Sequence, residues 1–219
     1  RIPSDEEIAA AESLVNYKDI LLRPEDHSVK LAKAGMSIDL GGIAKGYAVD
    51  EVRAIFAKHH IENGLINLGA SSMYALGSNA KGGPWRIGIK HPRNDDKDTY
   101  LGIVAVSNEN ISTSGDYERF FEENGVRYHH IFDPKTGRPA RSGVMSDSVL
   151  VDSSIEHGGM LGDMLTTILF VLGPERGMEF AHSVNGVEAM ITTTDGKIYM
   201  TDGFKSHFSD LNSDFKLMP

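Results

Sequence analysis

The sequence predicts an α+β fold in which antiparallel-rich sheets form layers with packed helices. Short apolar runs, bounded by turn pairs such as Asn124-Gly125 and Asp195-Gly196, recur along the chain and indicate strands joined by tight connections. A few segments with helical spacing interrupt these runs without alternating regularly with them, which is typical of α+β domains. With 219 residues, 40% of them hydrophobic, the chain suits one large domain or two small ones, and we treat residues 1–219 as one domain.

Four segments have the spacing of helices. Ser4 and Glu7 form a capping-box pattern ahead of apolar residues at helical spacing. A second helix is predicted over residues 43–59, and two more over about 160–172 and 174–183. In the second helix a buried stripe is expected to comprise Ala44, Ala48, Val52, Ile55 and Phe56.

The strands are predicted from alternating or continuous apolar runs. They are expected at 18–23, 28–32, 36–40, 65–76, 85–91, 101–107, 117–121, 126–132 and 144–151, with closing strands on both sides of Asp195-Gly196. A turn is expected at 112–116 and a solvated loop at 93–98. The tail, residues 205–219, is polar and expected to be loosely held.

Charge and composition exclude several classes of protein. The net charge of −9 argues against a nucleic-acid partner, because such binding needs a basic footprint. The absence of cysteine excludes disulfides, thiolate metal sites and cysteine nucleophiles, and it is compatible with an exported protein. The longest apolar run, 168–172, is far too short for a membrane span, so no intrinsic span is expected. The chain begins at Arg1 with no initiator Met and no visible signal peptide, which suggests a processed or trimmed chain.

The segment 37–50, Ser-Ile-Asp-Leu-Gly-Gly-Ile-Ala-Lys-Gly-Tyr-Ala-Val-Asp, contains the most informative pattern. A strand leads into Gly41 and Gly42, and a helix then opens with Lys45 in its first turn. Glycine lets a backbone approach a phosphate, and a helix N-terminus favours an anion. Gly42 and Lys45 are therefore a candidate pyrophosphate site; a plain strand–turn–helix corner with a surface lysine explains the spacing equally well. Neither the P-loop nor the dinucleotide fingerprint fits this spacing.

Asp163 and Thr167 lie four residues apart on a predicted helix and therefore share a face. A carboxylate and a hydroxyl are hard oxygen ligands suited to Mg²⁺, which usually keeps water and substrate phosphates as further ligands. The structural alternative is that Asp163 is an ordinary acidic residue near the start of a helix and that Thr167 is unrelated to it. Glu156 and His157, in the glycine-rich segment before this helix, could add ligands, but a loop role is favoured.

Two further groups are candidates for chemistry. Of the adjacent His129 and His130, only one can face a cleft if the side chains alternate, and a histidine there could carry a proton or simply be structural. Ser112, Thr113 and Ser114 offer hydroxyl and N–H groups that suit a flavin or phosphate, or a plain hairpin.

Three ordered blocks resemble the ApbE family of FAD:protein FMN transferases. They are the segment 39–50, the pair Ile-Ser-Thr-Ser-Gly-Asp-Tyr at 111–117 and His-Ile-Phe-Asp-Pro-Lys-Thr-Gly-Arg-Pro at 130–139, and Asp-Met-Leu-Thr-Thr-Ile-Leu-Phe-Val-Leu-Gly at 163–173. The resemblance covers most of the chain. It implies an ApbE-like fold from which the family's N-terminal region, which contributes to the FAD pocket, is missing.

The resemblance implies a specific set of site residues. Asp163, Thr167 and the carbonyl of Gly42 match the family's metal ligands, and His130 matches the active-site histidine. Gly41, Gly42, Lys45, Ser112, Thr113, Ser114 and His130 are then expected to contact FAD. Asp133 is expected to be mainly structural, Asp39 to orient the glycine turn and Asp50 to stabilise a helix.

The resemblance also implies the activity: Mg²⁺-dependent transfer of FMN from FAD to a Thr or Ser hydroxyl of a target flavoprotein, with release of AMP. The expected acceptors are flavoprotein subunits of membrane redox complexes, and the expected location is periplasmic or extracytoplasmic, with a lipid anchor on the full-length bacterial protein. The alternative is an FAD-binding module or FAD pyrophosphatase without transferase activity.

Overall fold

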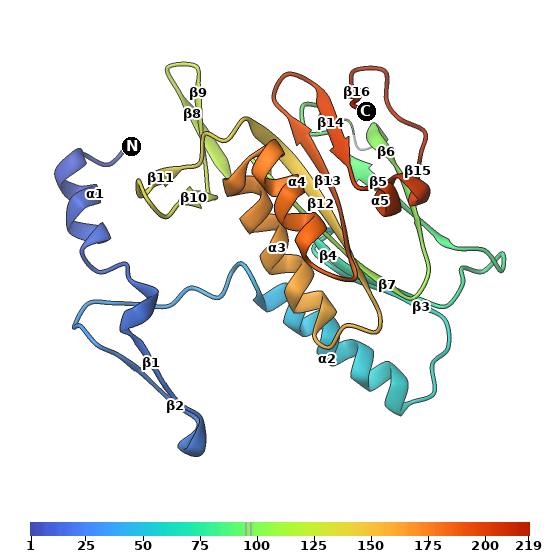
Figure 1. Cartoon of the computed structure of the whole chain (residues 1–219), viewed down its shortest axis with the longest axis horizontal. Coiled ribbons are helices and arrows are strands. Elements are labelled where there is room, and N and C mark those ends of the chain that lie inside the picture. Colours follow the sequence, from blue (N-terminus) through green and yellow to red (C-terminus); the bar gives the residue numbers. More distant parts are fainter. Residues whose placement is uncertain (95, 97) are drawn as a thin grey trace.

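The computed structural model describes residues 1–94, 96 and 98–219. Its centre is a seven-stranded sheet (Figure 1). In spatial order the strands are β16 (Lys216–Leu217), β14 (Lys197–Met200), β13 (Val187–Thr193), β12 (Val144–Asp152), β7 (Glu109–Gly115), β4 (Ser72–Leu76) and β3 (Gly64–Leu68). Neighbouring strands are antiparallel except β14 and β16, which are parallel.

A smaller sheet packs on one face of the large one. It has three antiparallel strands, β15 (Phe208–Ser209), β6 (Tyr100–Val106) and β5 (Trp85–Lys90). Ile87, Leu101 and Val104 of this sheet share a buried cluster with Leu150 and Met190 of the large sheet. This apolar layer is what joins the two sheets.

Helices cover the opposite face of the large sheet (Figure 1). They are α2 (Ala44–Lys58), α3 (Gly158–Leu172) and α4 (Pro174–Ser183); the shorter α1 (Asp5–Glu12) and α5 (Asp202–His207) lie at the two ends of the chain. A second buried cluster joins Leu169 and Phe170 of α3 to Val149 and Ile191 of the sheet. The molecule is thus layered as helices, large sheet and small sheet, and the predicted α+β class is confirmed.

The helix predictions hold with one correction. The Ser4 capping box forms, α4 has the predicted bounds, and α3 begins two residues early at Gly158. In α2 the predicted stripe is only partly right: Gly46 and Val49 are buried, whereas Ala44 and Ile55 are exposed. The stripe turns toward Gly46 because a glycine there lets α2 approach α3 closely.

Two strand predictions and one turn prediction need correction. Residues 36–40 form no strand, and the single strand predicted over 65–76 is a hairpin, β3–β4, that turns at Gly69 and Ala70 with positive φ values of 65° and 57°. The turn predicted at 112–116 is wrong, because β7 runs through Gly115 and pairs with β12 and β4. The turn within residues 65–76 carries no sequence signal, because the apolar run around it is continuous. Residues 112–116 resemble a turn because they are small and polar, although most of them belong to a strand. The loop expected over 93–98 includes residues 95 and 97, which lie outside the described residues.

Small hairpins project from the layers. The hairpin β8 (Phe120–Glu123) to β9 (Val126–His129) turns at Asn124 and Gly125, as predicted, with both residues at positive φ. Beside it lie the short strands β10 (Phe132–Asp133) and β11 (Arg138–Pro139). The hairpin β1 (Ile20–Arg23) to β2 (Ser28–Leu31), with short 3₁₀ helices at Tyr17–Asp19 and Pro24–Asp26, forms an arm with α1.

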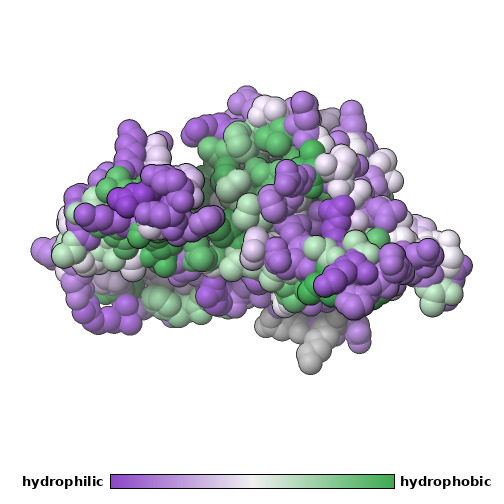
Figure 2. Space-filling model, turned by 90° about the horizontal axis from the view of Figure 1, so that it is seen from below, coloured by the Kyte–Doolittle hydropathy of each residue, from purple (hydrophilic) through white to green (hydrophobic). Residues whose placement is uncertain are grey.

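The two chain ends differ in how they are held. Residues 205–219, expected to be loosely held, are tied down instead: β15 pairs with β6, β16 pairs with β14, and Phe215 lies in the core. The N-terminal arm extends away from the layers and leaves apolar side chains such as Leu22 and Val29 exposed. Figure 2 shows hydrophobic surface between this arm, at the left, and the centre. Within the described residues, no helix combines the length and the hydropathy needed to cross a membrane.

Candidate functional site

The glycine turn leads directly into α2. The N–H of Gly41 donates to the Asp39 carboxylate at 2.7 Å, so Asp39 orients the turn as expected. Gly41, Gly42 and Lys45 are all exposed. The first N–H groups of α2 are partly occupied, because Ala44 donates to the carbonyl of Leu40. What the turn offers a ligand is therefore an exposed backbone at two glycines and the Lys45 ammonium.

The closest packing is at Gly46, one turn into α2. A Cβ at Gly46 would lie 2.0 Å from the carbonyl oxygen of Gly159 and 2.8 Å from Cβ of Asp163. These two glycines let the backbones of α2 and α3 cross almost in contact. Gly42 is less constrained, since a Cβ there would meet only the Thr167 hydroxyl, at 3.8 Å. Gly42 and Thr167 are thus neighbours.

Asp163 is the buried acid of this region, with 5% of its surface exposed. One carboxylate oxygen accepts from the N–H of Gly46 and the other from the hydroxyl of Ser72, both at 3.1 Å. Two donors leave lone pairs free on the carboxylate. The carboxylate, the Thr167 hydroxyl and the Gly42 backbone form a set of hard oxygen donors, and this set fits Mg²⁺ with further ligands from water or phosphate.

The start of α3 is fixed by Asp50 of α2. Its carboxylate accepts from the N–H groups of Gly159 and Met160, both at 2.9 Å. Asp50 therefore stabilises a helix, but the helix is α3 and not its own. Glu156 and His157 are exposed loop residues before α3. Within the described residues, no cluster of three or more His, Asp or Glu side chains could hold a metal without other donors.

The three hydroxyl residues predicted to contact FAD do not act together, because β7 is a strand and its side chains alternate. Ser112 and Ser114 face α3, where a Cβ on Gly162 would lie 3.0 Å from the Ser112 hydroxyl and Ser114 donates to Thr166 at 2.8 Å. Thr113 faces the opposite side and contacts the Ser148 hydroxyl at 2.8 Å. Ser112 and Ser114 thus support the helix that carries Asp163.

The two histidines face different surroundings, as predicted. His129 is buried: its Nε2 lies 3.1 Å from the carbonyl of Ala140, and its Nδ1 accepts from the N–H of Ile131 at 3.3 Å. Burial lowers the pKa of His129, so the ring is a neutral structural group. His130 is half-buried, and its Nδ1 lies 3.3 Å from the carbonyl of Arg119.

The pKa of His130 is lowered, mainly by burial and then by the positive charges of Arg119 and Lys45. A lowered pKa keeps the imidazole neutral and able to accept a proton near pH 7. Lys45, whose charge contributes to this lowering, lies in the first turn of α2, next to Gly46. Asp133 accepts from the N–H of Lys135 in the following turn, which fits its expected structural role.

A cavity of about 650 Å³ lies elsewhere, between α1 and the small hairpins. His129, Tyr128 and Phe132 line it, whereas Gly42, Lys45, Asp163 and Thr167 do not. The candidate site residues therefore lie outside this cavity, with Gly42 and Lys45 exposed and Asp163 buried.

Several residues that shape the site were not among those predicted from the sequence. Ser72 bonds to Asp163 from ninety-one positions away, and a serine in a short strand carries no signal of that contact. Arg119 follows the 111–117 block and its charge reaches His130. Gly46 lies inside the first block, where a glycine within a helix could have indicated a close helix crossing.

Comparisons with known proteins place the chain in a family. The ApbE family model matches residues 1–191. The "FAD:protein FMN transferase" of Klebsiella pneumoniae (strain 342) is 34% identical over 99% of this chain and 65% of its own length. The protein of the same name from Treponema pallidum is 33% identical over 99% of this chain and 61% of its own.

Solved structures give the same result. The ApbE protein of Thermotoga maritima superposes with a TM-score of 0.83 at 36% identity, over 96% of this chain and 65% of that one. The flavin transferase ApbE of Vibrio cholerae gives 0.79 at 34% identity, over 94% and 63%. The chain thus spans less than two thirds of the length of these relatives. A family match over most of the chain, together with a shared fold, shows that this protein belongs to the ApbE family.

Proposed function

We propose that the protein transfers FMN from FAD to a Thr or Ser hydroxyl of a target flavoprotein and releases AMP, with Mg²⁺ as the cofactor. The observation that carries the proposal is the meeting of the glycine block with α3: a Cβ on Gly42 would lie 3.8 Å from the Thr167 hydroxyl, and the N–H of Gly46 donates to Asp163. The Lys45 charge, in the same block, also acts on His130. The names of the relatives support FAD as the donor and a protein as the acceptor.

Asp163, Thr167 and the carbonyl of Gly42 would hold the metal ion. When bound, the ion would neutralise the pyrophosphate and polarise the phosphorus under attack. Lys45 would add a positive charge beside the same phosphates, and the exposed glycine backbone would let them approach. Catalysis would rest on positioning and charge stabilisation, as in other phosphoryl transfers.

His130 would act as the general base. If its Nδ1–H donates to the carbonyl of Arg119, Nε2 keeps the free lone pair and can take the proton of the acceptor hydroxyl. The acceptor oxygen then bonds to the FMN phosphorus, the bond from that phosphorus to the bridging oxygen breaks, and AMP leaves. The lowered pKa of His130 supports this role, because the base must be neutral.

A labelling experiment tests the proposal. The chain is mixed with FAD, Mg²⁺ and a flavoprotein domain that carries an acceptor hydroxyl, and the products are denatured. Transfer leaves in-gel flavin fluorescence and an added FMN mass on the acceptor. An acceptor Thr→Val variant is the matched control. If the mixture of the chain, FAD, Mg²⁺ and acceptor leaves no covalent flavin on the acceptor, the chain is not a complete transferase.

The same assay distinguishes FMN transfer from the alternative functions. Release of FMN and AMP without labelling would identify an FAD pyrophosphatase, in which water replaces the acceptor hydroxyl. Bound but intact FAD would identify a binding module. The fact that the chain spans less than two thirds of its relatives is the observation that keeps this alternative open.

Two further parts of the proposal come from the family resemblance. The acceptors are proposed to be flavoprotein subunits of membrane redox complexes, and the location to be periplasmic or extracytoplasmic, with a lipid anchor on the full-length bacterial protein. Cell fractionation and comparison of covalent flavin in membranes with and without the gene would test both.

A further inference from the structure

The hairpin β8–β9 carries His130 directly after its second strand. It belongs neither to the large sheet nor to the three-stranded sheet. An isolated two-stranded hairpin is only marginally stable in water. Much of its surface is exposed, including Phe120 and Phe121. The orientation of His130 therefore depends on the side chains that attach the hairpin to the layers.

Two residues of β9 provide such attachments. Arg127 and His129 are two positions apart and therefore project from the same face of the strand, opposite to Tyr128 and His130. His129 bonds to the carbonyl of Ala140, and its ring meets the ring of Phe170 edge-on with centroids 5.3 Å apart. This contact fixes one end of β9 to α3.

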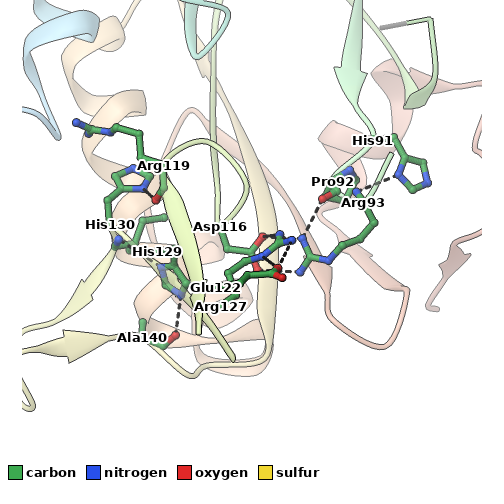
Figure 3. Close-up of polar contacts among 11 residues, drawn as sticks. His91, Pro92, Arg93, Asp116, Arg119, Glu122, Arg127, His129, His130 and Ala140 are labelled. Atoms are coloured by element: carbon green, nitrogen blue, oxygen red, sulfur yellow. Dashed lines mark hydrogen bonds and ion pairs between the residues drawn. The ribbon is translucent and has the colours of Figure 1, made fainter. Parts of the chain in front are cut away.

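Arg127 is held by Asp116 at the other end. Asp116 follows β7, is 7% exposed, and is fixed by its own N–H, which donates to the carbonyl of Met145 at 3.1 Å. Arg127 Nη1 lies 3.5 Å from Asp116 Oδ1, and its other nitrogens donate to Glu122 across the hairpin at 3.2 and 3.0 Å. Figure 3 shows Arg127 approaching the Asp116 carboxylate from the hairpin and Arg93 approaching it from the opposite side.

Arg93 completes the cluster from the loop after β5. It binds Asp116 in a two-pronged geometry, Nη1 to Oδ1 at 2.7 Å and Nη2 to Oδ2 at 2.8 Å. Its N–H donates to Nδ1 of the buried His91 at 3.1 Å, and His91 pairs with Asp214 at 3.2 Å. The Asp116 carboxylate thus connects the small sheet and the C-terminal segment to the hairpin.

We propose that Asp116 is a positioning residue for flavin transfer: fixed by Arg93, it holds Arg127 and so keeps the hairpin β8–β9 at the angle that presents His130 to the substrate. The inference rests on the proposed function, because His130 matters only if it takes the acceptor proton. Asp116 acts through Arg127 and the hairpin, not on the substrate.

The titration of His130 reports the position of the hairpin. Burial is the largest cause of its lowered pKa, and the charged groups that face it are Arg119, Lys45 and Glu118, with His129 as its neighbour in the chain. A displaced hairpin would hydrate His130 and move it away from Lys45. Both changes raise the pKa of His130 toward its ordinary value.

The experiment compares Asp116→Asn and Arg93→Gln with the unmodified chain. The control is Arg86→Gln, which breaks a single exposed pair with Asp210. His130 is titrated by NMR and amide exchange is measured over residues 120–130, both without FAD. We expect a raised His130 pKa and about tenfold faster hairpin exchange in the two variants, with Arg93→Lys restoring part of the effect. In the transfer assay, kcat should fall on the order of 10²-fold, with KM for FAD unchanged.

The outcomes separate the two proposals. The positioning role is overturned if the His130 titration and the hairpin exchange match those of Arg86→Gln, even when the melting temperature has dropped. These two readouts need no turnover, whereas covalent labelling alone decides the proposed function. Arg93→Gln leaves Asp116 in place and removes the guanidinium that fixes its carboxylate, so it keeps the test decisive if Asp116→Asn does not fold.

Discussion

The two halves of the candidate site are held by different means. The half around Asp163 depends on backbone contact: Gly46 and Gly159 bring α2 against α3, and the Asp163 carboxylate is enclosed by an N–H and a hydroxyl. The half around His130 is an exposed hairpin attached through side chains, chiefly His129 and Arg127. A close backbone crossing cannot shift without breaking the packing of two helices, whereas side-chain attachments can be loosened one at a time.

This difference suits the proposed transfer reaction. The proposed metal ligands would need fixed separations, because Mg²⁺ accepts only near-ideal octahedral geometry. The proposed base would have to meet an acceptor protein that arrives from solution, so it would benefit from a position at the surface. Substitutions in the first half should therefore act through ligand geometry, and those in the second through the placement and protonation of His130.

The largest expected effect is that of Asp163→Asn. The amide keeps the size of the side chain and removes the charge, so Mg²⁺-dependent FAD turnover should fall on the order of 10³-fold. Turnover is measured against Mg²⁺ concentration, with circular dichroism as a check on the fold. Thr167→Ser, which keeps the hydroxyl, should remain active, while Thr167→Val should not. Near-normal activity of Asp163→Asn at low Mg²⁺ would show that the metal does not bind in this half of the site.

The next effect concerns His130→Ala. Loss of the base should reduce acceptor labelling by about 10²-fold or more and leave FAD affinity nearly unchanged. In the unmodified chain, labelling should rise with pH and reach half of its maximum below about pH 6.5, since the pKa of His130 is lowered. Labelling and calorimetry are measured between pH 5 and 8.

His129→Ala is a contrasting variant and not a silent one. Its ring attaches β9 to Ala140 and Phe170, so the substitution should loosen the hairpin and lower the melting temperature. The effect on labelling should be smaller than that of His130→Ala. Equal labelling by His130→Ala and the unmodified chain would mean that the base lies elsewhere.

The next prediction concerns protein stability and depends on a buried acid in the rigid half of the molecule. Asp147, on β12, is fully buried, and neither carboxylate oxygen has a hydrogen-bond partner among the described residues. Burial raises its pKa well above the ordinary value; the backbone N–H of Ser114 approaches it without hydrogen-bond geometry and opposes this effect. The folded carboxyl therefore keeps its proton at a pH where the unfolded chain has lost it.

The sign follows from linkage. Above about pH 4 the unfolded chain binds fewer protons than the folded one, so Asp147 lowers stability increasingly as pH rises toward its folded pKa. Asp147→Asn should therefore stabilise the protein by about 1–3 kcal/mol at pH 7, and by less near pH 4. Urea unfolding at both pH values, with exposed Glu179→Gln as control, measures this. A stability gain that does not depend on pH would contradict the assignment.

The same contrast explains what could be predicted from the sequence. The layered α+β class, the helices α3 and α4 and the Asn124-Gly125 hairpin follow from local periodicity and turn chemistry. The position of Asp163 and Thr167 on one face of α3 follows from helical spacing, and the proposed roles of Gly42 and His130 come from the family blocks. Local sequence patterns are sufficient to predict a feature that depends on a single helix or hairpin.

The errors arise where distant segments decide the structure. Ser112–Asp116 reads as a turn because its residues are small and polar, yet the segment is a strand enclosed by β12, β4 and α3. The buried stripe of α2 is centred on Gly46 because of Gly159, more than a hundred positions away. The Arg93–Asp116–Arg127 cluster joins three separate segments, and no spacing rule brings them together.

The smallest expected effect is that of Lys45→Ala, which tests whether the two halves share a boundary. Lys45 is exposed on α2, beside the glycine turn, and its charge also acts on His130. One partly solvated charge contributes about 1 kcal/mol, so FAD affinity measured by calorimetry should fall about fivefold. Removing the charge should also raise the pKa of His130 slightly, which NMR titration detects. Lys58→Ala, at the far end of the same helix, should change neither. If Lys45→Ala alters FAD affinity but leaves the His130 titration unchanged, the hairpin half and the metal half function as separate surfaces.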